Sequence, residues 1–236
     1  MAKMLIGGEA VDSKGGETYE VKNPATGEAV DKVPKGRAED VEQAVAAAEA
    51  AFIEWSDTSP EERGKMLFHA CELIKEKEKE IAALLTAEQG KTLFEAGLEI
   101  HHLIHGLEFY AGLASKVRGD FVPLPQKGAH GMVIRQPIGV CGAIIPWNFP
   151  LTLMGTKLGP ALAAGNTIIG SLPPSSSVTR LISRPATSIT WRPTSVEPVK
   201  AIRRTRGCLR SASPTMLPGP VTTLTAPFGS VFLPPA

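Results

Sequence analysis

The sequence predicts an α/β fold, and three patterns in its first 170 residues support that prediction. Apolar residues recur at helical spacing from about residue 39 to residue 114. Residues 138–169 have the order of a buried strand, a loop, a helix and a second buried strand, which predicts two parallel strands joined by a crossover helix. Between these regions, residues 119–137 form two proline-containing extended arms around a glycine-rich turn, which predicts a projecting β-ribbon or an edge.

Short strands are expected over residues 4–34, where turn-forming residues separate runs of β-branched side chains. A helix is expected over residues 39–55, because its apolar residues fall on one stripe and two acids occupy its first turn. The next helix begins with Ser59 as the cap and Pro60 at the first helical position. Its apolar stripe is expected to face the core.

The boundaries of the following helices are also encoded locally. The run KEKEKE at residues 75–80 is expected to face solvent and to contain a break in the helix. Gly90 is expected to end the helical segment, because glycine suits the left-handed conformation found there. Thr92 and Glu95 have the spacing of a capping box, which predicts that another helix starts at this point.

The composition changes near residue 170. Residues 1–170 carry 17 Lys and Arg against 23 Asp and Glu, whereas residues 171–236 carry 8 against a single acid and hold 11 of the 20 prolines. A net charge of +1 argues against a general nucleic-acid or membrane binder, and no apolar run approaches the roughly 20 residues that span a bilayer. Three well-separated cysteines suggest neither disulfides nor a metal site, so a cytoplasmic location is expected.

The most unusual stretch is PWNFP at residues 146–150, hereafter the proline-bounded loop. It follows the first buried strand, and open α/β sheets bind ligands at the carboxyl ends of their strands. A carboxamide fixed by a stiff loop can stabilise a developing oxyanion, so Asn148 is a candidate catalytic residue. The alternative is that Trp147 and Phe149 anchor the core while Asn148 satisfies backbone groups of a turn.

The stretch PIGVCGAIIPWNFPLTLMGTKLGPALAAGNTII at residues 137–169 resembles the N-terminal signature of the NAD(P)-dependent aldehyde dehydrogenase family. NPATGE at 23–28, EERGKML at 61–67 and EQGKTLFEA at 88–96 are similar to the same family in the same order. The resemblance covers residues 1 to about 170. It implies the N-terminal portion of an aldehyde-dehydrogenase-like fold, with a partial Rossmann-like sheet and NAD or NADP as cofactor.

The resemblance also implies roles for individual positions. Asn148 matches the asparagine that helps to hold the oxyanion when a cysteine thiolate attacks an aldehyde. The positions that match the lining of the cofactor cleft or lie near it are Ile144, Ile145, Pro146, Trp147 and Lys157. Lys157 could equally be a solvated surface residue. The arms at residues 119–137 match the ribbon through which family subunits oligomerise, so a homo-oligomer acting on a small aldehyde is expected.

Beyond residue 170 the family pattern stops. Ser171 stands where the resemblance expects the lysine that bonds the cofactor ribose, and no segment matches the glycine-rich turn, the water-activating glutamate or the nucleophilic cysteine. With the change in composition, this predicts that residues 171–236 are a disordered, non-native tail read in a shifted frame. The chain is then a truncated, inactive aldehyde dehydrogenase. The alternative is a non-catalytic protein that docks on full-length dehydrogenase subunits.

Three further features of the sequence carry part of the pattern of a chemical or binding site. Cys208 lies between basic residues that favour a thiolate, but no general base accompanies it. His101 and His105 have the spacing of metal ligands on a helix but lack a third ligand, so no metal is expected and both are placed on the polar face. The arginines at residues 203–210 accompany no nucleic-acid-binding motif, so no nucleic-acid partner is expected.

Overall fold

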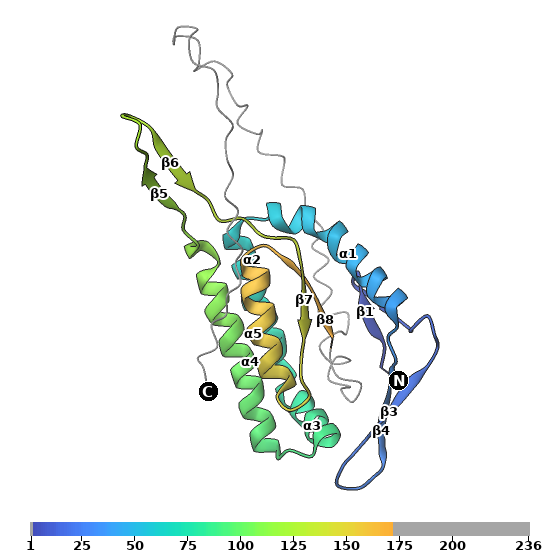
Figure 1. Ribbon diagram of the computed structural model, residues 1–236. Helices are drawn as coiled ribbons and strands as arrows, with labels where there is room; N and C mark the ends of the chain where they lie inside the picture. Colours follow the sequence, from blue (N-terminus) through green and yellow to red (C-terminus); the bar gives the residue numbers. More distant parts are fainter. Residues whose placement is uncertain (1, 172–236) are drawn as a thin grey trace, which may run out of the picture.

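The computed structural model of the chain describes residues 2–171 and has the predicted mixture of helices and strands (Figure 1). Two antiparallel hairpins open the described part, formed by β1 (Met4–Ile6) with β2 (Glu9–Val11) and by β3 (Thr18–Lys22) with β4 (Ala29–Pro34). The predictions of a disordered tail, of an inert Cys208 and of a non-binding arginine cluster concern residues outside the described part.

The helices of the described part are α1 (Ala38–Asp57), α2 (Pro60–Glu76), α3 (Glu78–Gln89), α4 (Leu93–Leu113) and α5 (Pro150–Ala163). Their predicted boundary signals are confirmed. The Ser59 hydroxyl accepts a hydrogen bond from the Glu62 amide at 3.2 Å. Gly90 ends α3 with a left-handed φ of 77°, and the capping box between Thr92 and Glu95 is complete. The expected break in the charged run lies between α2 and α3.

A short 3₁₀ turn, Ala114–Lys116, leads from α4 into the ribbon formed by β5 (Asp120–Pro123) and β6 (His130–Val133). The two strands pair antiparallel, and Figure 1 shows the ribbon extending beyond the end of α4. Next, β7 (Val140–Ile144) pairs in parallel with β8 (Thr167–Ser171), and α5 connects them. The predicted ribbon and the predicted strand–helix–strand unit are therefore both present.

The main core lies among α2, α3, α4 and α5, and its most deeply buried side chains include Cys71, Leu85, Ile100, Leu103 and Leu151. Helices α4 and α5 lie side by side in Figure 1. Gly155 and Gly159 of α5 permit this close approach: a methyl group on Gly159 would lie 2.7 Å from the ring of Tyr110. Packing between these two helices therefore fixes where α5 begins.

Helix α1 departs from the expectation. Its predicted apolar stripe is only partly covered, since Val41 is 57% exposed and Ala51 is also exposed. The described part offers α1 little to pack on, because its main neighbour is the narrow sheet of β7 and β8. The Thr167 hydroxyl of β8 donates a hydrogen bond to the Ala48 carbonyl at 2.9 Å, which ties α1 to that sheet.

Candidate functional site

The proline-bounded loop leaves the carboxyl end of β7 and runs directly into α5. Trp147 and Phe149 are 61% and 53% exposed, so the alternative in which they anchor the core does not describe this part of the chain. Asn148 is exposed as well. Its carboxamide forms no hydrogen bond with any residue between 2 and 171, so it does not satisfy a turn either.

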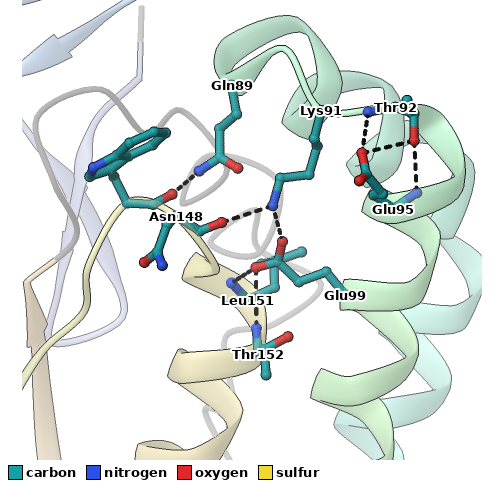
Figure 2. A network of polar contacts seen from close by, with 9 residues as sticks. Gln89, Lys91, Thr92, Glu95, Glu99, Asn148, Leu151 and Thr152 are labelled. Carbon is teal, nitrogen blue, oxygen red and sulfur yellow. Dashed lines mark hydrogen bonds and ion pairs between the residues drawn. The ribbon is translucent and has the colours of Figure 1, made fainter.

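The main chain of the loop is held by two side chains, one from the last residue of α3 and one from the turn that joins α3 to α4. The Lys91 ammonium donates a hydrogen bond to the Asn148 carbonyl at 3.1 Å, and the Gln89 amide donates one to the Trp147 carbonyl. Figure 2 shows the Asn148 carboxamide pointing away from Lys91. The backbone is thus fixed on one side while the amide is presented on the other.

The same network includes a buried acid, Glu99 of α4, which is 1% exposed. One of its carboxylate oxygens accepts hydrogen bonds from the backbone amides of Leu151, at 2.7 Å, and Thr152, at 3.4 Å. The other oxygen forms an ion pair with Lys91 (Figure 2). Helix α5 has no cap from its own preceding residue, so a carboxylate from another helix satisfies its first free amides.

The opposite end of α5 is held by a buried cation. Arg63 of α2 is 7% exposed, and its guanidinium donates hydrogen bonds to the carbonyls of Ala163, at 3.2 Å, and Thr58. Burial lowers the pKa of this guanidinium from its ordinary value. A negative charge at the start of α5 and a positive charge at its end both match the helix dipole. Buried charges from two other helices therefore set the position of α5.

The shorter stretches that resembled the family contact this helix, its loop or the residues that hold them. Gly90 packs so tightly on the turn at residues 23–28 that an added methyl group would lie 2.7 Å from the Pro24 ring. Lys91 follows directly and reaches the proline-bounded loop. Arg63, from EERGKML, holds the other end of α5. Two of these segments, far apart in sequence, therefore hold the loop and its helix directly, and the third packs on the residue before Lys91.

The positions expected near the cofactor do not share one environment. Ile144 is 87% exposed, and Pro146, Trp147 and Lys157 are exposed as well. Ile145 points the other way, is 3% exposed and packs in the core. Only its backbone is therefore available to a ligand, whereas the other four positions offer side chains to the surface.

These residues fit part of a dinucleotide. The exposed apolar surface around Ile144 and Trp147 suits the flat rings of NAD or NADP. The N-terminus of α5 does not suit the pyrophosphate, although helix N-termini after a parallel strand often bind phosphate. The Glu99 carboxylate already accepts from the amides of Leu151 and Thr152 and would repel a phosphate. These two amides are therefore not free to bind a phosphate.

Neither cysteine of the described part has the character of a nucleophile. Cys71 is fully buried on α2, and burial raises the pKa of its thiol to about 11. Burial also raises the pKa of Cys141, which lies within β7. Both thiols are therefore protonated near neutral pH. His101 and His105 are exposed, and residues 2–171 contain no group of three side chains able to hold a metal ion.

Sequence reasoning did not single out Arg63, Gln89, Lys91 or Glu99. A signal for two of them was present. Glu99 lies at helical spacing from Ala96 and Leu103, on the apolar stripe of α4, and Arg63 lies one turn before Leu67 on the buried face of α2. A charged residue inside an apolar stripe requires a buried partner. Gln89 and Lys91 lie next to a helix end, where spacing gives no such signal.

Comparisons with known proteins identify the family of the chain. The sequence model of the Aldehyde dehydrogenase family matches residues 10–185. Glutarate-semialdehyde dehydrogenase from Pseudomonas putida is 42% identical over 164 residues, which are 70% of this chain and 34% of that protein. The mitochondrial succinate-semialdehyde dehydrogenase of Oryza sativa subsp. japonica is 41% identical over 165 residues, covering 70% of this chain and 31% of that protein.

Solved structures give the same result. Succinate-semialdehyde dehydrogenase from Burkholderia pseudomallei superposes with a TM-score of 0.75 at 38% identity, covering 78% of this chain and 38% of that chain. A 3,6-anhydro-L-galactose dehydrogenase in complex with NAP also gives a TM-score of 0.75, at 33% identity, over 78% of this chain and 39% of that chain.

The chain therefore belongs to the aldehyde dehydrogenase family, whose cofactors are NAD and NADP. It spans about a third of the length of the curated relatives described above. Among residues 2–171, no helix has both the length and the apolar character needed to cross a bilayer. The cytoplasmic location stays a prediction.

Proposed function

We propose that this chain carries the oxyanion-binding side of an NAD(P)-dependent aldehyde dehydrogenase site, with Asn148 as its hydrogen-bond donor. One observation carries the proposal. The backbone on both sides of Asn148 is tied to buried or partly buried side chains, whereas its carboxamide is exposed and has no partner among residues 2–171. A donor on a fixed backbone, with no partner among residues 2–171, is suited to stabilising a developing negative charge.

In this proposal, a thiolate attacks the carbonyl carbon of the aldehyde, and the carbonyl oxygen becomes an oxyanion. The Asn148 carboxamide donates an N–H hydrogen bond to that oxygen. The cofactor, when bound, supplies a hydride acceptor. The exposed side chains of Ile144, Pro146 and Trp147 would contact its rings, while Lys157 lies seven residues after Pro150, the first residue of α5. The backbone of Ile145 completes the lining.

The proposal also covers the activity of the printed polypeptide. Cys71 and Cys141 are protonated near neutral pH and therefore do not act as the nucleophile. No stretch of the 236 residues matches the nucleophilic cysteine or the water-activating glutamate of the family. We therefore expect no turnover from this polypeptide by itself. The composition change near residue 170 supports a shifted reading frame as the cause.

Two assays test these statements. The purified 236-residue chain is given NAD⁺ or NADP⁺ with an aldehyde, and no increase in absorbance at 340 nm is expected. A chimera then joins residues 1–169 to the part of Pseudomonas putida glutarate-semialdehyde dehydrogenase that follows its matched segment. We expect aldehyde-dependent cofactor reduction by the chimera. Turnover by the chain alone would contradict the first statement, and a folded but inactive chimera would contradict the second.

The second candidate function is non-catalytic docking on full-length dehydrogenase subunits. It is favoured by exposed apolar side chains on the ribbon: Phe121 is 64% exposed, Met132 75% and Ile134 58%. Residues 119–137, the ribbon expected to mediate assembly, would then bind a subunit rather than a second copy of this chain. Co-purification of the tagged chain with an intact family dehydrogenase, lost in a Met132→Asp variant, supports docking. Equal recovery of both variants would contradict it.

A further inference from the structure

We propose that Lys91 and Glu99 act together as positioning residues for Asn148. The two side chains form one ion pair and hold the chain at the asparagine and at the start of the helix that follows it. That the pair thereby orients an oxyanion donor rests on the proposed function.

The contacts of the pair run from the asparagine to the first turn of α5. Lys91 holds the carbonyl of Asn148 itself, at 3.1 Å. Glu99 holds the amides of Leu151 and Thr152, three and four residues further on. Because the two charges are joined to each other, the segment between them is fixed at both ends by one unit. No contact of the pair involves the Asn148 carboxamide, which stays available to a ligand.

The loop residue next to Asn148 adds a third contact. The Lys91 ammonium lies 4.9 Å from the centre of the Phe149 ring, within the range of a cation–π interaction. Lys91 therefore touches the backbone of residue 148 and the side chain of residue 149 at once. Removing its charge would release two neighbouring positions of the loop.

The burial of the pair argues for a geometric role. The side chain of Glu99 is 1% exposed and that of Lys91 is 12% exposed, whereas the Lys65–Glu61 pair on α2 is 67% and 74% exposed. A buried ion pair adds little net stability, because desolvation offsets the attraction between the charges. What a buried pair does provide is a unique arrangement of the groups that it bonds. In this chain those groups are the Asn148 carbonyl and the first free amides of α5.

The composition of the chain allows a direct test. The chain has three asparagines, at positions 23, 148 and 166. A sample labelled with ¹⁵N only in asparagine gives three peptide signals and three carboxamide pairs in a two-dimensional NMR spectrum. Asn166 is 4% exposed and bonded to the backbone of Ile138, so it reports on the fold. Asn23 lies in the surface turn that packs on Gly90 and bonds to the Ala25 amide, so it reports on whether a change at Lys91 spreads to that neighbouring turn.

Four variants complete the design. Lys91→Met removes the cation, and Glu99→Gln keeps an acceptor for α5 while removing the charge that holds Lys91. Lys91→Arg restores a cation at the same place. Lys65→Met removes a lysine from an exposed pair and is the matched control. We expect the Asn148 signals to shift or split in Lys91→Met and Glu99→Gln, and to return to one set in Lys91→Arg.

The signals of Asn23 and Asn166 should be unchanged throughout, as should every signal in Lys65→Met. Unchanged Asn148 signals in Lys91→Met would overturn the proposal. So would a joint change of all three asparagines, which would mean that the pair supports the fold in general, and so would a failure of Lys91→Arg to restore the spectrum.

This test does not depend on turnover. If Asn148 has no part in oxyanion binding, the chimera keeps its activity after Asn148→Ala while the NMR result still holds. If the positioning inference is wrong, the NMR result fails while the loss of activity in Asn148→Ala remains. The two proposals can therefore fail separately.

Discussion

Replacement of Glu99 is the perturbation whose cost follows most directly from the structure. Alanine at this position removes a carboxylate that is 1% exposed, leaves the Leu151 and Thr152 amides without acceptors and leaves Lys91 without its counter-ion. Breaking a buried pair in this way costs about 3–5 kcal/mol of unfolding free energy. Glutamine keeps an acceptor but not the charge, so we expect a smaller loss of about 1.5–3 kcal/mol, as for a hydrogen bond to a charged group.

Urea unfolding followed by circular dichroism at 222 nm measures both losses. Glu61→Gln is the matched control, because its carboxylate pairs with Lys65 at 2.8 Å but is 74% exposed. The control should lose at most about 1 kcal/mol. A Lys91→Met change should cost less in the Glu99→Gln background than in the parent, since the charge that Lys91 neutralises is already gone. A Glu99→Gln loss no larger than that of Glu61→Gln would refute the reasoning.

Three other predictions follow from the described residues and the sequence. Gly64→Ala should destabilise the chain by about 1–3 kcal/mol, because the new methyl group would lie 2.8 Å from a backbone carbonyl of α4. Gly112→Ala, with open space around it, should stabilise α4 by about 0.5–1 kcal/mol, and equal effects in urea unfolding would contradict both statements. Hydrogen bonds from the backbone amides of Lys14 and Arg37 hold the pKa of Asp40 below its ordinary value. The stability contributed by this carboxylate is therefore present at neutral pH and lost as the pH falls through the lowered pKa. The deficit of Asp40→Asn in unfolding free energy should shrink below about pH 4, and a deficit independent of pH would contradict this. Finally, resequencing the gene across the composition change and reading its other frames should reveal a Lys-Pro pair shortly after Ile169; frames without it would contradict the shifted-frame proposal.

Features encoded by neighbouring residues could be predicted from the sequence. The capping box of Thr92, the cap at Ser59 and the left-handed Gly90 each depend on a few adjacent side chains, and all three are found in the structure. The strand–helix–strand unit and the ribbon were also predictable, because short apolar runs and prolines define their limits. Local chemistry therefore accounts for most of the described fold.

Features that depend on distant contacts could not be predicted in the same way. Helical spacing identifies the face of α4 that is buried, but it does not say that Glu99 on that face bonds to the start of α5, 52 residues later. The same holds for Arg63 and the carbonyl of Ala163, which are separated by 100 residues. Asn148 was identified as a candidate from its loop and from the family resemblance. The contacts that fix its backbone were visible only in the structure.

The central claim is that the Asn148 carboxamide is a donor held ready for an oxyanion. The most direct test is kcat of the chimera with Asn148→Ala, compared with Lys65→Met as a control on the exposed face of α2. We predict a loss of about 10²–10³ in kcat for Asn148→Ala, the usual effect of removing one oxyanion donor, and no loss for Lys65→Met. An Asn148→Ala chimera that keeps the full kcat would contradict the claim.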